Sequence, residues 1–159
     1  MEREDLGALF AGSDDESLLL ALYSRIHNPR DEIPRTFRLA WEAFELVHSD
    51  GFEMLIGQDT SMEDYSTALC KIGVPQAERI FSRVLALIPP DLLLAQDEEV
   101  FGEHLHSRFE ELRELAYEFY DACAAVDFVS LAGRYVRQHR ETFYQYAVIS
   151  AAETEPGEG

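Results

Sequence analysis

Lysine is almost absent from this chain: Lys71 is the only one among 13 basic residues, which face 31 aspartates and glutamates. The formal net charge of the 159 residues is −18. A field of that sign repels phosphate groups and anionic lipid headgroups, and it attracts basic partners. The composition therefore argues against direct binding of DNA, RNA or a membrane surface.

Cysteine is also scarce, and long apolar runs are missing. Cys70 and Cys123 fall on apolar faces of predicted helices, where a reduced thiol behaves as a small hydrophobic side chain. The apolar stretch Val84 to Ile88 is far shorter than the about 20 residues that a membrane-spanning helix needs. The segment Met1 to Asp5 is acidic, whereas a secretory signal begins with basic residues. These features predict a cytoplasmic protein with two buried, unpaired thiols.

Motifs that carry catalysis are missing as well. The tripeptide His48 to Asp50 contains the residue types of a hydrolytic triad, but triad side chains converge from separate parts of a fold. His104 and His106, beside Glu103, lie two positions apart, and such positions face in different directions on a helix. The sequence has no glycine-rich phosphate loop, nucleophile elbow or paired-cysteine motif. We therefore expect no enzymatic activity, no cofactor and no metal site. A small hydrolase or metal enzyme that uses these histidines and nearby acids is the disfavoured alternative.

Helix signals are what the sequence does contain. Ser13 to Glu16 forms a capping box, and Ser61 with Asp64 forms a second, weaker cap. Pro34 occupies a first helical position, and Gly51 ends the helix that it opens. Apolar residues recur every three or four positions between these signals, with no period-two alternation of useful length. The expected helices cover residues 13–28, 34–50, 52–56, 61–73, 75–88, 98–123, 127–136 and 143–149. We predict an all-α fold, an irregular bundle of roughly seven helices.

The apolar content of 47% suits one domain with one core. We predict that this domain covers residues 1–150 and that residues 151–159 form a disordered acidic tail. The predicted core residues are Phe37, Trp41, Phe44, Phe52, Leu69, Ile80, Val84, Leu112 and Phe119.

A small basic face and a late aromatic cluster accompany this pattern. Arg134, Arg137, Arg140 and His139 are expected to pair with acids of the same chain, because many acids are nearby. Aromatic residues at helical spacing usually belong to the core. The late cluster consists of Tyr117, Phe119, Tyr120, Phe143, Tyr144 and Tyr146. The sequence leaves open which of them contact a partner.

The acids are concentrated between Asp91 and Asp121, a segment that contains ten acids and only two arginines. Six recur at spacings of three, four and seven, opposite the apolar stripe, and on one continuous helix they form a row with ~6 Å steps over roughly 33 Å. They are Glu99, Glu103, Glu110, Glu114, Glu118 and Asp121. We predict that this row, which is similar to a run of backbone phosphates, is the partner-binding site. Two alternatives need no specific partner. The row is a solvated helix face whose charge Arg108 and Arg113 partly neutralise, or the acids reflect the acidic proteome of a salt-adapted host.

Several segments carry a family resemblance. They are Trp41-Glu42, Ser49 to Leu55, Ala68 to Gly73, Ala77, Ile80, Phe119-Tyr120 and Tyr135. Over about residues 36 to 145, the chain resembles the bacterial DNA-mimic protein family. The resemblance implies an acidic all-helical protein that forms a homodimer and occupies the DNA-binding surface of a helix-turn-helix regulator. The family's usual Asn-Gly-Gly-Phe turn is Ser49-Asp50-Gly51-Phe52 here, and Gly51-Phe52 reads as a helix stop followed by an aromatic anchor.

Charge pattern and resemblance together predict a function. We expect a non-enzymatic protein that binds a basic DNA-binding protein, such as a transcription regulator, by presenting carboxylates where phosphates would lie. An immunity or antidote protein that neutralises a basic toxin, such as a nuclease, is the alternative. The two readings differ in the partner and not in the physics of binding.

Overall fold

The computed structural model describes residues 3–12, 14–94 and 97–144, and this part of the chain contains helices and no strand. The helices are α1 (Arg3–Gly12), α2 (Asp15–Arg25), α3 (Glu32–Asp50), α4 (Phe52–Ile56), α5 (Met62–Ile72), α6 (Gln76–Ala86), α7 (Pro90–Leu94), α8 (Glu98–Ser107), α9 (Phe109–Ala125) and α10 (Phe128–Gln138). Residues 140–144 add a short helical segment. The all-α class is confirmed. The helices outnumber the roughly seven expected, because α1 and α7 were not predicted and the segment 98–123 is divided in two.

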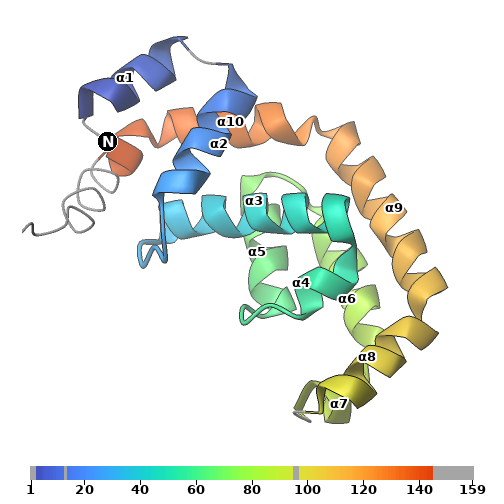
Figure 1. The fold of residues 1–159 in the computed structure, drawn as a ribbon. Coiled ribbons are helices and arrows are strands. Elements are labelled where there is room, and N and C mark those ends of the chain that lie inside the picture. The colour runs from blue at the N-terminus through green and yellow to red at the C-terminus, as the bar shows by residue number, and fades with distance from the viewer. Residues whose placement is uncertain (1–2, 13, 95–96, 145–159) are drawn as a thin grey trace, which may run out of the picture.

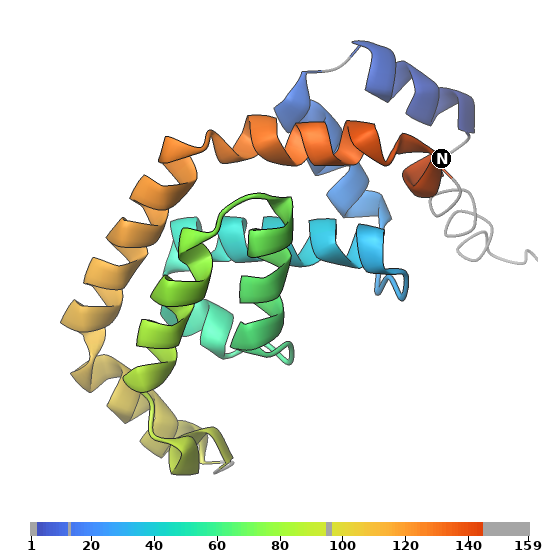
Figure 2. The same cartoon turned by 180° about the vertical axis from the view of Figure 1, so that it is seen from behind.

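The helices pack around α3, which crosses the middle of the molecule in Figure 1. α3 packs against α5, α5 against α6, and α6 against α9, while α10 packs against α2. α9 runs down one flank, and α8 and α7 lie at its lower end (Figure 1), as the view from behind in Figure 2 also shows. Because the other helices pack on one side of α9, its outer side faces solvent.

No described helix is both long and apolar enough to cross a lipid bilayer.

The core forms one cluster, as predicted. Eight of the nine predicted core residues are buried. The exception is Phe44, which is half-buried at the edge of the cluster, with its ring 4.4 Å from that of Phe128. Edge-to-face contacts of Phe81 with Phe52 at 5.3 Å and with Phe119 at 5.6 Å join α4, α6 and α9. These rings fix the inner face of α9, and therefore the direction of its outer face.

The helix starts are close to those predicted, with two corrections. Asp14, rather than Ser13, caps α2, because its carboxylate accepts the Ser17 N–H at 2.7 Å; Ser13 lies outside the described residues. Pro34 is the third residue of α3 instead of the first, which its missing N–H allows because the first turn of a helix has no intrahelical acceptors. The Ser61 cap is confirmed by its bond from the Asp64 N–H at 3.1 Å.

Gly51 ends α3 as expected. Its N–H bonds to the Val47 carbonyl at 3.0 Å, and its φ of +82° with ψ of −179° is a backbone conformation that essentially only glycine adopts. Phe52 follows directly and is fully buried. The structural reading of Gly51-Phe52 as a helix stop and an aromatic anchor is confirmed.

The expectation of one continuous helix over residues 98–123 is wrong. α8 ends at Ser107, and α9 begins at Phe109 after Arg108 leaves the helical conformation. Two side chains of α8 bond to backbone carbonyls here: Ser107 Oγ donates to the His104 carbonyl at 2.6 Å, and His104 Nε2 lies 2.8 Å from the Leu87 carbonyl. The His104 bond holds α8 against the segment between α6 and α7, and at the end of α8 the His104 carbonyl accepts from both the Ser107 hydroxyl and the Arg108 N–H. Phe109, expected in the apolar stripe, is 47% exposed.

Two other predictions at the end of the chain are not covered. The helical segment expected over 143–149 is described only up to Tyr144. The expected acidic tail, residues 151–159, lies outside the described residues, as does Tyr146.

The two cysteines have different environments, although both are free thiols. Cys123 is 2% exposed, and burial raises its pKa to about 12. Cys70 is partly exposed and lines a hollow between α5 and α6, so the expectation that both are inaccessible is wrong for Cys70. The face of α5 that carries Cys70 is only partly covered by α6.

This difference predicts thiol reactivity. At neutral pH a native sample treated with a thiol-specific chromogenic reagent should label one cysteine per chain quickly, because a raised pKa and burial keep Cys123 as an inaccessible thiol. The Cys70→Ser variant should show no fast phase, and denaturant should release the second thiol. Rapid labelling of the Cys70→Ser variant in its native state would contradict the assignment.

Candidate functional site

α9 has two opposite faces. Its inner face is buried against α4 and α6 and consists of Leu112, Leu115, Ala116, Phe119, Ala122 and Cys123. Glu110, Glu114, Glu118 and Asp121 are all exposed. At about 100° per residue, these four fall within an arc of about 80° on the side opposite the buried residues. We call them the α9 acidic face; it extends roughly 16 Å along the helix axis.

The six predicted site residues do not form a single row. Glu99 and Glu103 are exposed, but they belong to α8, which takes a different direction after the break at Arg108 (Figure 1). The continuous row of roughly 33 Å is therefore replaced by two shorter acidic segments that meet at an elbow. The larger of the two is the α9 acidic face.

Few cations neutralise the α9 acidic face. Arg83 of α6 pairs with Glu118 at 2.5 Å. In the described part of the chain, no ion pair involves Glu110, Glu114 or Asp121. Arg79 of α6 also lines a hollow with Glu118 and Asp121, without forming an ion pair among the described residues. The negative charge on the solvent side of α9 is therefore only partly compensated.

The two arginines that were expected to neutralise part of the charge of the row, Arg108 and Arg113, make their main contacts elsewhere. Arg108 pairs with Glu111 at 3.2 Å, outside the acidic face. Arg113 donates from Nε to the Tyr117 hydroxyl at 3.2 Å, and this bond is the main reason why the pKa of Arg113 is raised. Glu110 makes a smaller contribution to the same pKa shift without an ion pair. Arg113 thus reduces the charge at only one end of the acidic face.

The side chains considered for catalysis do not converge as a triad or as a metal site. His48 contacts the rings of Phe44 and Tyr120 at 4.3 and 4.4 Å, and this burial lowers its pKa, partly offset by a bond between Nδ1 and the Phe44 carbonyl. Ser49 Oγ instead donates to Asp50 at 2.9 Å. His104 bonds the Leu87 carbonyl, while His106 is exposed. Among the described residues no three histidine, cysteine or acidic side chains gather as a metal site.

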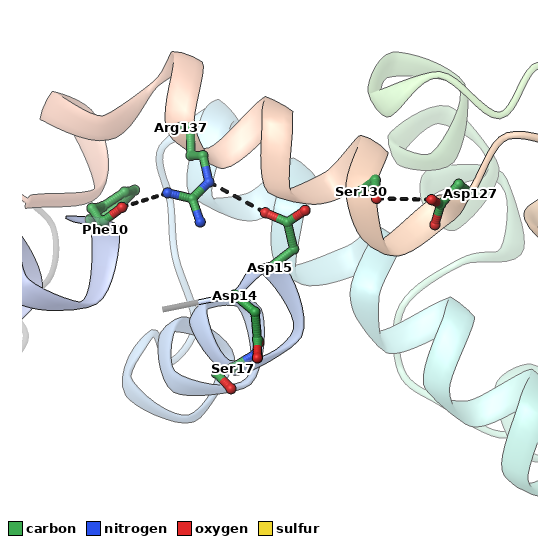
Figure 3. Close-up of polar contacts among 7 residues, drawn as sticks. All are labelled: Phe10, Asp14, Asp15, Ser17, Asp127, Ser130 and Arg137. Atoms are coloured by element: carbon green, nitrogen blue, oxygen red, sulfur yellow. Dashed lines mark hydrogen bonds and ion pairs between the residues drawn. The ribbon is translucent and has the colours of Figure 1, made fainter. Parts of the chain in front are cut away.

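The basic face near the end of the chain is used within the molecule. Arg137 on α10 donates to Asp15 on α2 at 3.3 Å and to the Phe10 carbonyl on α1 (Figure 3). Gly133 allows this approach, since a Cβ there would lie 2.4 Å from the Asp15 carboxylate. The prediction of intramolecular pairing is confirmed for Arg137.

Comparison with known families gives a result for most of this fold. The family described as DMP19-like protein matches residues 30–139, which is more than half of the chain. The chain belongs to the DMP19-like family. This is a family of DNA mimics, so the resemblance noted over residues 36 to 145 is supported. No curated protein and no solved structure matches the chain.

The part of the chain that is DMP19-like runs from before α3 to the end of α10 and contains the whole α9 acidic face. It also contains two exposed aromatic residues that sequence reasoning did not assign to the site. Tyr117 is 50% exposed on α9, and Phe109 is exposed at its start. Spacing was the available signal for Tyr117, because it lies three residues after Glu114 and four before Asp121 and so shares their face.

Proposed function

We propose that this DMP19-like protein binds a basic, DNA-binding protein and that the α9 acidic face takes the place of a DNA phosphate strand. In this role the protein acts by binding and not by catalysis. The observation that carries the proposal is the exposure of four carboxylates on one side of α9, in a chain with a net charge of −18.

The charge spacing supports a match to one DNA strand. A single strand of B-DNA advances about 3.4 Å along the axis per phosphate, which places about five phosphates in a length of roughly 16 Å. The α9 acidic face presents four carboxylates over the same length. Duplex DNA has about twice this charge density, so α9 alone resembles one strand.

Stability explains only part of the acidic face, because Glu110 lies in the first turn of α9 and is favoured there by the helix dipole, whereas the other three acids are not. Glu110 and Glu114, like Glu114 and Glu118, are four residues apart, and each such like-charge pair costs a helix about 0.2–0.5 kcal/mol. Asp121 lies near the negative end of the helix dipole, which is also unfavourable. Of the four acids, Glu118 alone has an ion pair within the described residues, and its partner is Arg83. An arrangement of acids that costs stability is consistent with a role of this face in binding.

The proposal names a class of partner: a protein whose DNA-binding surface is basic, such as a helix-turn-helix regulator. The homodimer implied by the family resemblance and the cytoplasmic location both stay predictions. An antidote to a basic toxin would use the same face, and the identity of the bound protein separates the two.

The proposal is tested by capture on the immobilised protein from a host lysate at low salt. The captured protein should be a basic DNA-binding protein, and both raised salt and added duplex DNA should release it. Salt acts because exposed charges are screened over about 8 Å at physiological ionic strength, and DNA acts because it competes for the same surface. A captured protein that resists both treatments would contradict the proposal, and a captured basic toxin would favour the antidote function.

A further inference from the structure

Tyr117 borders the α9 acidic face on one side, about midway along its length. Glu110, Glu114, Tyr117 and Asp121 follow one another at spacings of four, three and four, so they occupy neighbouring positions on one side of the helix. At about 100° per residue, the angle around the helix axis between Tyr117 and either Glu110 or Asp121 is smaller than the angle between Glu118 and Glu110. Its ring is half-exposed and is bordered by carboxylates on both sides along the helix.

The ring of Tyr117 is held in place by contacts within the protein. It packs edge-to-face against Tyr120, with ring centroids 5.7 Å apart. Tyr120 is itself anchored, because its hydroxyl donates to the Val47 carbonyl at 2.8 Å and its ring lies against His48. A ring that is already ordered loses little conformational freedom when a partner binds it.

The same ring already receives one guanidinium group. The Cζ atom of Arg113 lies 5.5 Å from the Tyr117 ring centroid, within the range of a cation–π contact. Its Nε donates to the Tyr117 hydroxyl. This internal contact shows that the chemistry of the ring suits arginine, whose planar head both stacks on aromatic faces and donates to neighbouring oxygen atoms.

We propose that Tyr117 receives an arginine side chain of the basic partner and gives the α9 acidic face a preference for arginine over lysine. The inference rests on the proposed function, which supplies the partner. The guanidinium stacks on the exposed ring and donates to the carboxylate of Glu114 or Asp121. Lysine gains less at this position, because its compact ammonium group is strongly hydrated and has no planar face to stack.

Tyr117 and the carboxylates then have different roles. Exposed charges steer a partner and make binding sensitive to salt, whereas an exposed aromatic side chain at the centre of a contact slows dissociation. The carboxylates alone attract any basic surface. Tyr117 selects among basic surfaces for those that present arginine.

Two designed peptides test this inference without a natural partner. Both are 16-residue, alanine-based helices with three basic residues at spacings of four, arginine in one and lysine in the other. The variants are Tyr117→Ala, Tyr117→Phe and, as a control, Leu20→Ala, which shortens an equally exposed side chain on α2, away from α9 (Figure 1). Calorimetry gives each dissociation constant, and backbone amide shifts in NMR spectra locate the bound peptide.

The wild-type protein should bind the arginine peptide more tightly than the lysine peptide, with shifts centred on α9. Tyr117→Ala should weaken arginine binding by roughly two- to fivefold, the size of an exposed cation–π contact, and should weaken lysine binding less. Tyr117→Phe, which keeps the ring face, and Leu20→Ala should retain the preference. An unchanged ratio in Tyr117→Ala, or shifts centred away from α9, would overturn the inference.

Neutralising the carboxylates separates this inference from the proposed function. Such a variant should weaken the binding of both peptides, while the part of the arginine preference that comes from stacking on the Tyr117 ring should persist. If the peptides respond as expected but no basic DNA-binding protein is captured from the lysate, the proposed function fails while the arginine preference of Tyr117 stands. If the capture succeeds but the ratio ignores Tyr117, only the inference about Tyr117 fails.

Discussion

Replacement of Trp41 by alanine should lower the free energy of unfolding by about 3–5 kcal/mol, the range for truncating a large buried aromatic residue. Trp41 lies in the middle of α3 and is 2% exposed. Its ring contacts those of Phe44 at 5.5 Å and Phe128 at 6.2 Å, so it links α3 to α10. The loss combines the removed apolar surface with the cavity left between these two helices. Urea unfolding followed by far-UV circular dichroism measures it.

Leu20→Ala is the matched control for this measurement. Leu20 is an exposed apolar residue on α2, and its truncation should change stability by no more than about 0.5 kcal/mol. A Trp41→Ala protein with the same unfolding midpoint as the wild type would show that the packing between α3 and α10 is not as described.

The helices that could be predicted from the sequence are those with local signals. Ser61 caps α5 through a bond to a residue three positions away, and Gly51 stops α3 through its own backbone conformation. Signals of this kind lie within a few residues of the structure that they specify. The buried face of α9 could be predicted for a similar reason, because its apolar spacing continues over the whole helix.

The break between α8 and α9 could not be predicted in this way. The spacing of Leu105, Phe109 and Leu112 is helical throughout, so the pattern contains no interruption. α8 is held in its direction by contacts with residues distant in the chain, among them the bond between His104 and the Leu87 carbonyl, 17 positions away. No local pattern in the sequence marks His104 or Leu87 as residues that bond to each other.

The candidate site divides along the same line. Exposure of Glu110, Glu114 and Asp121 follows from their positions on one helix. The pairing of Glu118 with Arg83 joins residues 35 positions apart and needs the packing of α6 against α9. Cys70 and Phe44 were predicted to be buried but are only partly buried, because an apolar helical position becomes buried only where another element covers it.

Charge removal on the α9 acidic face should weaken binding of the captured partner by about an order of magnitude. The variant carries Glu110→Gln, Glu114→Gln and Asp121→Asn, which are the three acids of the α9 acidic face that form no ion pair within the described residues. Exposed charge pairs contribute about 0.2–1 kcal/mol each, and three lost pairs together give an effect of this size. The variant should fold as well as the wild type, because the repulsion between Glu110 and Glu114 is relieved.

A variant with Glu16→Gln, Glu45→Gln and Glu63→Gln is the control, since it removes the same charge from exposed positions on α2, α3 and α5. Dissociation constants for the captured partner are measured for both variants at low and physiological salt. The α9 variant should lose more affinity than the control and should respond less steeply to salt, because fewer charges are left to screen. Equal losses would mean that net charge alone attracts the partner. No loss in either would make the acidic face a solvated surface without a role in binding.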